Sequence, residues 1–238
     1  MTRSASKTRT TKETDISVTV NVDGDGSNDI STGLPFFDHM LDQLGRHGGM
    51  NLTVRAVGDL HVDGHHTVED TGILLGEVFR EALGDKAGVR RFASGLFPLD
   101  EALIEVALDL SGRPYLVYDV PFGEVLPLGT PPFNPEMAEH FFRSFVDAAH
   151  ITLHVNRRAG ANTHHVIEAA FKGVARCIRD AVRVEGSALP STKGVLCPRP
   201  SRAWGVPHEG RRVGLRDRQP AVRPEGIRAR RCRCPAHR

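Results

Sequence analysis

Apolar positions recur with two different periods along residues 15–184. Three-to-four spacing predicts helices over 35–47, 66–84, 135–149 and 164–184. Alternating or β-branched runs predict strands over 15–22, 51–58, 92–98, 101–111, 114–120 and 151–158. Pro35 and Pro135 stand at helix starts, where the missing N–H costs little. Short strands grouped around pairs of helices favour an α+β fold.

The second half of this pattern echoes the first. The segment "FFDHMLDQL" aligns with "MAEHFFRSF", "NLTVRAVGD" with "HITLHVNRR", and "HHTVEDTGILLGEVFREAL" with "HHVIEAAFKGVARCIRDAV". We interpret this as a tandem duplication. It predicts two similar halves, 13–90 and 91–196, each with a small sheet and two helices, preceded by a flexible N-terminus over 1–12 and followed by a tail over 197–238.

The charge is distributed unevenly between the body and the tail. The chain carries a formal +2, but residues 197–238 hold 12 arginines, no lysine and three acids, hence +9. Subtracting these from totals of 31 basic and 29 acidic residues leaves 19 and 26 in residues 1–196, or −7. The tail's six prolines and lack of apolar periodicity predict disorder and no role in the chemistry.

Composition also bears on compartment and partners. The sequence contains no run of about 18 apolar residues, so no membrane span is predicted. The N-terminal "MTRSASKTRTTKETD" has no apolar leader segment. Residues 1–196 contain one cysteine, Cys177, which lies in an apolar helical pattern and is expected in the core. We expect a cytoplasmic protein without a membrane partner. The tail does not favour a nucleic-acid ligand, because it has no lysine and no alternating aromatic residues.

Metal-ligand residue types occur in one ordered set, twice. The first set is His39, His65, His66 and Glu69; the second is His140, His164, His165 and Glu168. A lone histidine is most often structural. Six histidines and two glutamates in a duplicated order instead predict metal binding.

Helix geometry indicates how these ligands divide. His65 and Glu69 are four residues apart and face the same way, as are His164 and Glu168, so each pair can chelate one ion. Neighbouring side chains point about 100° apart, so His66 and His165 would reach a second ion. Each of two sites would then take one pair, the off-face histidine of the opposite repeat, and one of His39 or His140. Nitrogen and oxygen ligation suits manganese, iron, cobalt, nickel or zinc.

Several basic residues stand where they could form an anion site. Arg91 follows the second predicted helix, Arg113 lies in the turn "LSGRPY", and Lys193 lies in "PSTKG" beside Ser191. Each alone is most simply a solvated charge. Together they suit phosphate, which arginine forks and lysine bind well.

These motifs carry a family resemblance. The segments "FFDHMLDQLGRHGG", "GDLHVDGHHTVEDTG", "PLDEALIEVALDLSGRPYL", "EHFFRSF", "NTHHVIEAAFKG" and "PSTKGVL" resemble the imidazoleglycerol-phosphate dehydratases of histidine biosynthesis, from about Lys12 to Leu196. The resemblance implies halves like the second domain of ribosomal protein S5. It also implies a 24-subunit shell with two manganese ions per active site, bound between neighbouring subunits.

The resemblance also assigns residues. One manganese would take His39, His66, His164 and Glu168, and the other would take His65, Glu69, His140 and His165. Gln43, His47 and Lys172 would approach the substrate, and Arg91, Arg113, Ser191 and Lys193 would hold its phosphate. Glu13 matches the family's acid–base candidate and would also touch substrate; Glu69 and Glu168 complete the expected catalytic carboxylates.

The implied reaction dehydrates D-erythro-imidazoleglycerol phosphate to imidazoleacetol phosphate and water. No carbonyl is available to stabilise the developing charge, so metals on both ring nitrogens would favour an imidazolate form of the substrate that expels the hydroxyl.

Two other interpretations stay open. The chain could be a metal-binding or nucleic-acid-binding protein with an S5-like fold and a basic tail, although the −7 body argues against it. It could also be a binuclear metallohydrolase, although the duplicated motif offers no evident bridging carboxylate.

Overall fold

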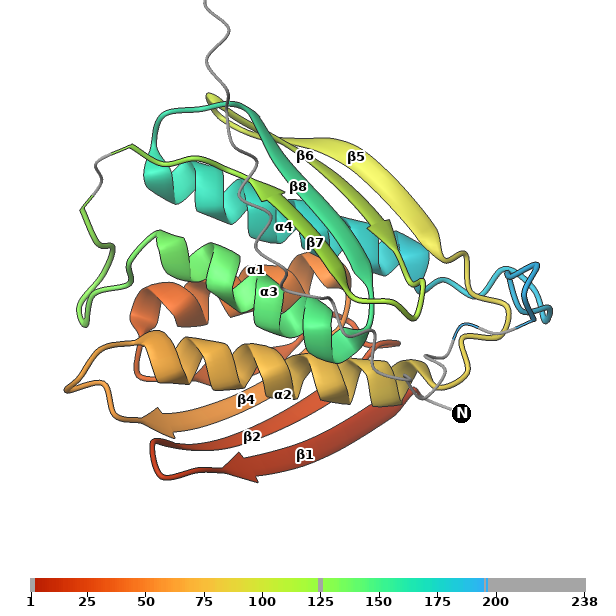
Figure 1. Ribbon diagram of the computed structural model, residues 1–238, viewed down its shortest axis with the longest axis horizontal. Helices are drawn as coiled ribbons and strands as arrows, with labels where there is room; N and C mark the ends of the chain where they lie inside the picture. The colour runs from red at the N-terminus through yellow and green to blue at the C-terminus, as the bar shows by residue number, and fades with distance from the viewer. Residues whose placement is uncertain (1–2, 124–125, 195, 197–238) are drawn as a thin grey trace, which may run out of the picture. The chain divides into compact units, whose positions relative to one another are not determined.

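Two four-stranded sheets lie on either side of a set of helices in the described part of the chain (Figure 1). The computed structural model describes residues 3–123, 126–194 and 196. All of them belong to the first of two units into which the chain divides, Met1–Pro200 and Ser201–Arg238. The tail predicted to be disordered, 197–238, lies outside the described residues.

Both halves use the same order of elements. The first contains β1 (Ser4–Thr10), β2 (Thr14–Asn21), β3 (Asn28–Ser31), α1 (Pro35–Gly48), β4 (Asn51–Gly58) and α2 (His65–Leu83). The second contains β5 (Phe92–Leu99), β6 (Ala102–Asp109), β7 (Tyr115–Asp119), α3 (Glu136–Ala149), β8 (Thr152–Ala159) and α4 (Thr163–Ala181).

The two sheets repeat one topology. Their strand orders are β1-β2-β4-β3 and β5-β6-β8-β7, with only the third strand of each half in a parallel pairing. This confirms the predicted α+β class with two similar halves. The likeness to ribosomal protein S5 stays a prediction.

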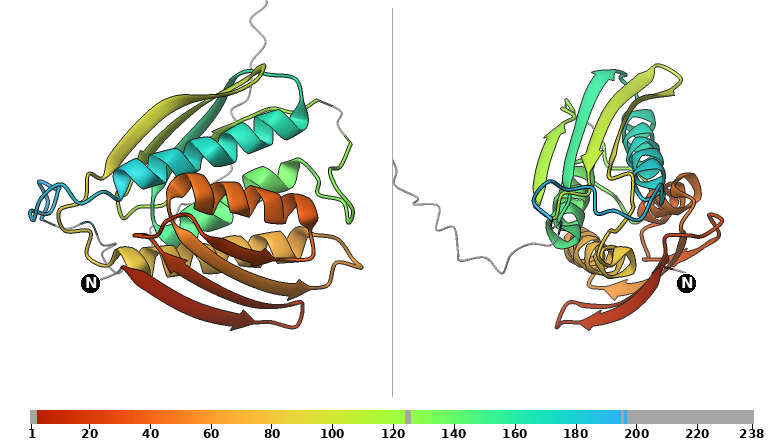
Figure 2. Two further views of the ribbon diagram at one scale, coloured as in Figure 1. Left: turned by 180° about the vertical axis from the view of Figure 1, so that it is seen from behind. Right: turned by 90° about the vertical axis from the view of Figure 1, so that its right-hand side faces the viewer.

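The helices pack on each other across the two halves. Helix α2 lies against α3, and α1 lies against α4, while α2 and α4 cover the inner faces of the first and second sheets (Figures 1 and 2). Phenylalanines fill the junction: the Phe141 ring of α3 stacks on Phe171 of α4 at 5.3 Å and meets Phe37 of α1 edge-on at 5.4 Å. All three side chains are fully buried. Burial of such large apolar groups is the main force that joins the halves.

The prediction of a flexible N-terminus over 1–12 is wrong for residues 4–10. They form β1, which pairs antiparallel with β2 from Ser4 opposite Asn21 to Thr10 opposite Asp15. The strand lacks an apolar face because charged side chains attach it to α2. Lys7 Nζ lies 3.2 Å from Glu81 Oε2, and Arg9 Nε donates to Asp70 Oδ1 at 3.1 Å.

A second difference concerns the short β3. The segment "DGDGSND" (23–29) reads as a turn, but Asn28 and Asp29 begin a strand that pairs parallel with β4. Four residues of mixed polarity carry no readable period. The ten predicted elements are all present, with ends that differ by no more than three residues. Cys177 is buried, as expected. No helix in the described residues has the length and apolar character needed to cross a membrane.

Candidate active site

The paired histidines stand in the first turns of α2 and α4. Asp63 Oδ1 accepts a hydrogen bond from the His65 backbone N–H at 2.8 Å. In α4 the N-cap residue Asn162 does the same for His164 at 2.9 Å and His165 at 3.3 Å. A short polar side chain that caps the free backbone N–H groups starts a helix at a defined residue. In both halves a short polar side chain two residues before the first histidine thus accepts its backbone N–H, although α2 begins at His65 and α4 begins at Thr163.

A first cluster lies between α1 and α4. His39 Nε2 is 3.4 Å from Glu168 Oε2, and His164 Nε2 is 3.0 Å from the same oxygen. The Glu168 side chain is 13% exposed, whereas both imidazoles are 42% exposed. The carboxylate is therefore held inside while two ring nitrogens face the opening.

A second cluster lies between α2 and α3. The rings of His65 and His140 are 4.2 Å apart between centroids, and His140 Nε2 is 3.6 Å from Glu69 Oε1. Burial lowers the pKa of His140, and the neighbouring His65 adds to this, so the surroundings favour the neutral imidazole. His140 Nε2 is buried and has no hydrogen-bond partner among the described residues. A cavity of about 220 Å³ opens here, lined by His65, Glu136, Met137 and His140.

Each cluster joins the two halves of the chain. Within each, one ligand atom per residue lies within 4.8 Å of the others. His39 comes from the first half and joins the His164–Glu168 pair of the second; His140 comes from the second half and joins the His65–Glu69 pair of the first. Helix geometry alone does not determine which of His39 and His140 joins which His–Glu pair. The structure groups them as the family resemblance implied.

His66 and His165 do not join these clusters in the described chain. The His65 and His66 rings are 6.0 Å apart at 89°, and those of His164 and His165 are 6.2 Å apart at 84°. Their Nδ1 atoms contact carboxylates, His66 with Asp59 Oδ2 at 2.9 Å and His165 with Glu101 Oε2 at 2.8 Å. These hydrogen bonds raise the pKa of both imidazoles, and that of His165 lowers the pKa of Glu101 to about 2.

Three predicted substrate residues surround the first cluster. Lys172 Nζ lies 2.6 Å from Glu168 Oε1, one helical turn along α4. Burial alone would raise the pKa of Glu168, but the hydrogen bond and charge of Lys172 hold it below its ordinary value. Gln43 Nε2 lies 3.4 Å from His39 Nδ1, and its Oε1 lies 3.2 Å from His47 Nε2. Gln43 and His47 therefore form a polar row that leads to His39, and Lys172 lies against Glu168.

Glu13 lies beside His66. Its Oε2 is 3.8 Å from His66 Nε2, and its side chain is half exposed. The Glu13 backbone N–H donates to Thr11 Oγ1 at 3.1 Å in the turn between β1 and β2. The Glu13 backbone is thus held by a hydrogen bond, while its carboxylate is half exposed close to the predicted metal ligand His66.

The predicted phosphate residues lie at the opposite end of α2 and α4 from the histidines. Arg91 follows α2 and Ser191 and Lys193 follow α4, whereas the paired histidines begin both helices (Figure 1). Arg91 binds Asp109 through Nε at 2.7 Å and donates to the Pro190 carbonyl at 2.7 Å. Arg113 is exposed in the turn after β6. Within one chain, the predicted phosphate-binding residues therefore do not lie next to the two histidine–glutamate clusters.

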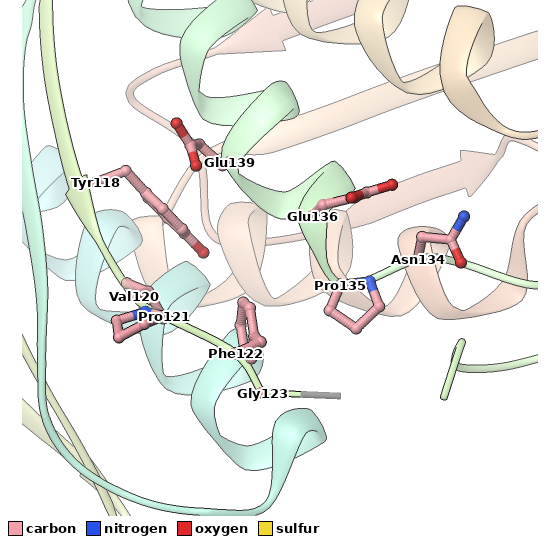
Figure 3. Close-up of a pocket in the computed structure, with 9 residues that line it drawn as sticks. All are labelled: Tyr118, Val120, Pro121, Phe122, Gly123, Asn134, Pro135, Glu136 and Glu139. Atoms are coloured by element: carbon pink, nitrogen blue, oxygen red, sulfur yellow. The ribbon is translucent and has the colours of Figure 1, made fainter. Parts of the chain in front are cut away.

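A further cavity of about 520 Å³ lies beside the start of α3 (Figure 3). It is lined by Tyr118, Val120, Pro121, Phe122, Gly123, Asn134, Pro135, Glu136 and Glu139. Complete burial raises the pKa of Tyr118, whose hydroxyl has no hydrogen-bond partner among the described residues. None of the eight predicted metal ligands lines this cavity.

The sequence and the fold as a whole are similar to those of one protein family. Residues 32–178 match the family model described as imidazoleglycerol-phosphate dehydratase. The chain belongs to this family. Membership confirms the predicted resemblance and the prediction that the protein is an enzyme.

Relatives and solved structures of the dehydratase family agree over most of the chain. A dehydratase of Acidothermus cellulolyticus is 58% identical over 196 residues, covering 82% of this chain and 93% of that protein. One from Acidiphilium cryptum is 54% identical over 199 residues, covering 82% and 100%. The crystal structure of the Pyrococcus furiosus dehydratase matches with a TM-score of 0.69 at 36% identity, covering 80% and 100%. That of the Staphylococcus aureus dehydratase matches with a TM-score of 0.67 at 36% identity, covering 75% and 97%.

Two contacts in this dehydratase-family site were missed by the sequence analysis. Asp59 follows β4 and Glu101 precedes β6, and each binds one of the paired histidines. The alignment of the repeats pairs Asp59 with Arg158, so the duplication gave no signal for a shared carboxylate position.

Proposed function

We propose that this protein dehydrates imidazoleglycerol phosphate to imidazoleacetol phosphate in histidine biosynthesis, with two manganese ions per active site. The observation that carries the proposal is the pair of clusters, each with two imidazoles and one carboxylate, in a member of the dehydratase family. The substrate's imidazole ring has two nitrogens, which gives two metal sites a purpose.

The donor set fits manganese. Both clusters offer nitrogen and oxygen ligands and no thiolate, which suits this ion. The buried Nε2 of His140 has no hydrogen-bond partner in the part of the chain that the structure describes, which fits a ligand atom whose partner is a metal. His39, His164 and Glu168 would hold one ion together with His66, and His65, Glu69 and His140 would hold the other together with His165.

When bound, manganese would supply Lewis-acid polarisation of the substrate ring and a template for its orientation. Lys172 neutralises Glu168 on the side away from His164, which keeps the carboxylate ionised and fixed. Gln43 and His47 extend the polar row from His39, where they can hold the hydroxyl groups of the substrate.

Glu13 is the residue proposed to move protons. The reaction removes a hydroxyl as water and a proton from the neighbouring carbon, so it needs an acid and a base. The Glu13 carboxylate is half exposed next to His66, where it can accept the carbon-bound proton and return it to the solvent or product.

The site needs more than one copy of the chain. Helix α4, with 19 residues, spans about 28 Å at 1.5 Å per residue and separates its histidines from Ser191 and Lys193. A three-carbon phosphate cannot bridge that distance. Arg91, Arg113, Ser191 and Lys193 of one subunit would therefore hold the phosphate of substrate bound to the histidines of a neighbour, within the 24-subunit shell implied by the resemblance.

Substrate turnover tests the proposal. The intact protein, supplied with manganese, is expected to consume imidazoleglycerol phosphate and form imidazoleacetol phosphate. A metal-loaded, assembled protein without this activity would contradict the function and favour a metal-binding role. Loss of a hydrolysable phosphate ester without the keto product would favour the binuclear hydrolase instead.

A further inference from the structure

His66 and His165 each have one ring nitrogen occupied by a carboxylate. The Nδ1 atoms lie 2.9 Å from Asp59 and 2.8 Å from Glu101. The Nε2 atoms have no such contact: the nearest carboxylate oxygens are those of Glu13 at 3.8 Å and Asp100 at 3.9 Å. An ionised carboxylate only accepts hydrogen bonds, so Nδ1 carries a proton, and in the neutral imidazole Nε2 then keeps its lone pair.

The Glu101 contact is built into the start of α4. Glu101 Oε1 accepts the backbone N–H of Asn162 at 2.9 Å, while its Oε2 contacts His165. Asn162 in turn caps the helix through the N–H groups of His164 and His165. The turn between β5 and β6, the helix cap and the imidazole are thus linked in one hydrogen-bonded unit.

The Asp59 contact is held from a different element. Asp59 directly follows β4, its side chain is 17% exposed, and its carbonyl closes a turn by accepting the Val62 N–H at 2.8 Å. The imidazole of His66 is 32% exposed. A largely buried carboxylate therefore fixes a more exposed ring.

The two carboxylates do not descend from one position of the duplication. Asp59 aligns with Arg158, whereas Glu101 precedes β6 as Glu13 precedes β2. In the first half Glu13 lies near Nε2 of His66, whereas in the second half Glu101 contacts Nδ1 of His165. A carboxylate thus contacts Nδ1 of the second histidine in both halves, but it comes from positions that are not equivalent in the repeat. The duplication alone therefore does not explain these two contacts.

We propose that Asp59 and Glu101 are positioning residues that present Nε2 of His66 and His165 to metal. This inference rests on the proposed function, since it takes these histidines as ligands. A carboxylate on the second nitrogen orients a metal-binding imidazole and selects its tautomer, and its loss costs about 10- to 100-fold in metal affinity.

The test measures manganese affinity of the full-length assembled protein by electron paramagnetic resonance of free Mn²⁺. Asp59→Ala and Glu101→Ala are expected to weaken binding about 10-fold or more. Asp59→Asn and Glu101→Gln are expected to keep most of the affinity, because an amide oxygen still accepts from Nδ1–H. Glu105→Ala is the matched control, since Glu105 lies on β6 and pairs with Arg158. Thermal unfolding of each metal-free variant reports any loss of folding.

A double variant separates positioning from a general effect on the fold. Glu101→Ala in a His165→Ala background is expected to leave the remaining manganese affinity unchanged, because there is no ring left to orient. Additive losses would overturn the proposal, as would alanine variants that bind like Glu105→Ala or amide variants as weak as the alanine ones. Failure of the unaltered protein to bind manganese would instead refute the proposed function.

Discussion

His39 Nε2 lies 3.4 Å from Glu168 Oε2, although the two residues belong to opposite halves of the chain. They meet because α1 packs on α4, as α2 packs on α3 around the second cluster. The two clusters are thus a product of the junction between the halves, and neither half could form them alone. The following predictions depend on this arrangement.

Replacement of Glu13 tests its role in proton transfer. Glu13→Gln keeps the shape and removes the base, so turnover should fall about 100-fold or more, while manganese content stays unchanged. Turnover is measured as formation of imidazoleacetol phosphate, and metal content by elemental analysis. Asp15→Asn, on β2 and bonded to Thr10, is the control. Full turnover of Glu13→Gln with intact metal would refute the role.

Mixed assemblies test whether one active site uses two chains. His164→Ala removes a histidine-end residue and Arg113→Ala a phosphate-end residue, and each variant alone should be inactive. Co-expression should restore activity, since random mixing leaves roughly a quarter of sites with both intact contributions.

The control for mixed assemblies pairs two defects at the same end. His164→Ala co-expressed with Glu168→Gln should show no recovery, because both changes damage the same cluster. If Arg113→Ala and His164→Ala together give no more activity than the parents, the arrangement between subunits is wrong.

Gly76 tests the close packing of α2 on α3. A Cβ at Gly76 would lie 2.5 Å from the Phe145 carbonyl oxygen and 2.8 Å from the Ala148 Cβ, so Gly76→Ala must push the helices apart. We expect a loss of about 1–3 kcal/mol in the free energy of unfolding, together with weaker manganese binding at the second cluster. Both are measured by denaturant unfolding and metal titration. Gly123→Ala, where no described residue lies within 4 Å of the added Cβ, should change neither; a stable Gly76→Ala would contradict the close approach.

The lowered pKa of His150 is expected to contribute to the pH dependence of the free energy of unfolding. Burial, then Arg80 and Lys86, lower its pKa from the ordinary value of 6.5. The unfolded chain therefore takes up a proton at higher pH than the folded one, and stability falls as pH drops through 6.5.

The matched variant for this pH effect is His150→Asn, because asparagine tolerates the left-handed backbone at this position (φ 54°). Between about pH 7.5 and pH 5.5 the melting temperature of the unaltered protein should fall more than that of His150→Asn. Equal falls in the two proteins would show that His150 does not titrate as described.

Long periodic elements and the duplicated ligands could be predicted from the sequence because each carries a local signal. The ten predicted elements depend only on local periodicity, and the pairing of His65 with Glu69 depends only on spacing along one helix. Strand β1 could not be predicted, because its inner face uses Lys7 and Arg9 and is matched to acids on α2. The contacts of Asp59 and Glu101 join elements distant in sequence, and no spacing rule relates them to the histidines.

If the two clusters bind manganese for the dehydration, turnover depends on this ion. The most direct measurement is a titration of metal-free protein with manganese while the formation of imidazoleacetol phosphate is followed. We predict no turnover without metal and a rise that saturates at two manganese ions per chain, with the double variant Glu69→Gln, Glu168→Gln inactive throughout. Full turnover by metal-free protein, or by that double variant, would contradict the account.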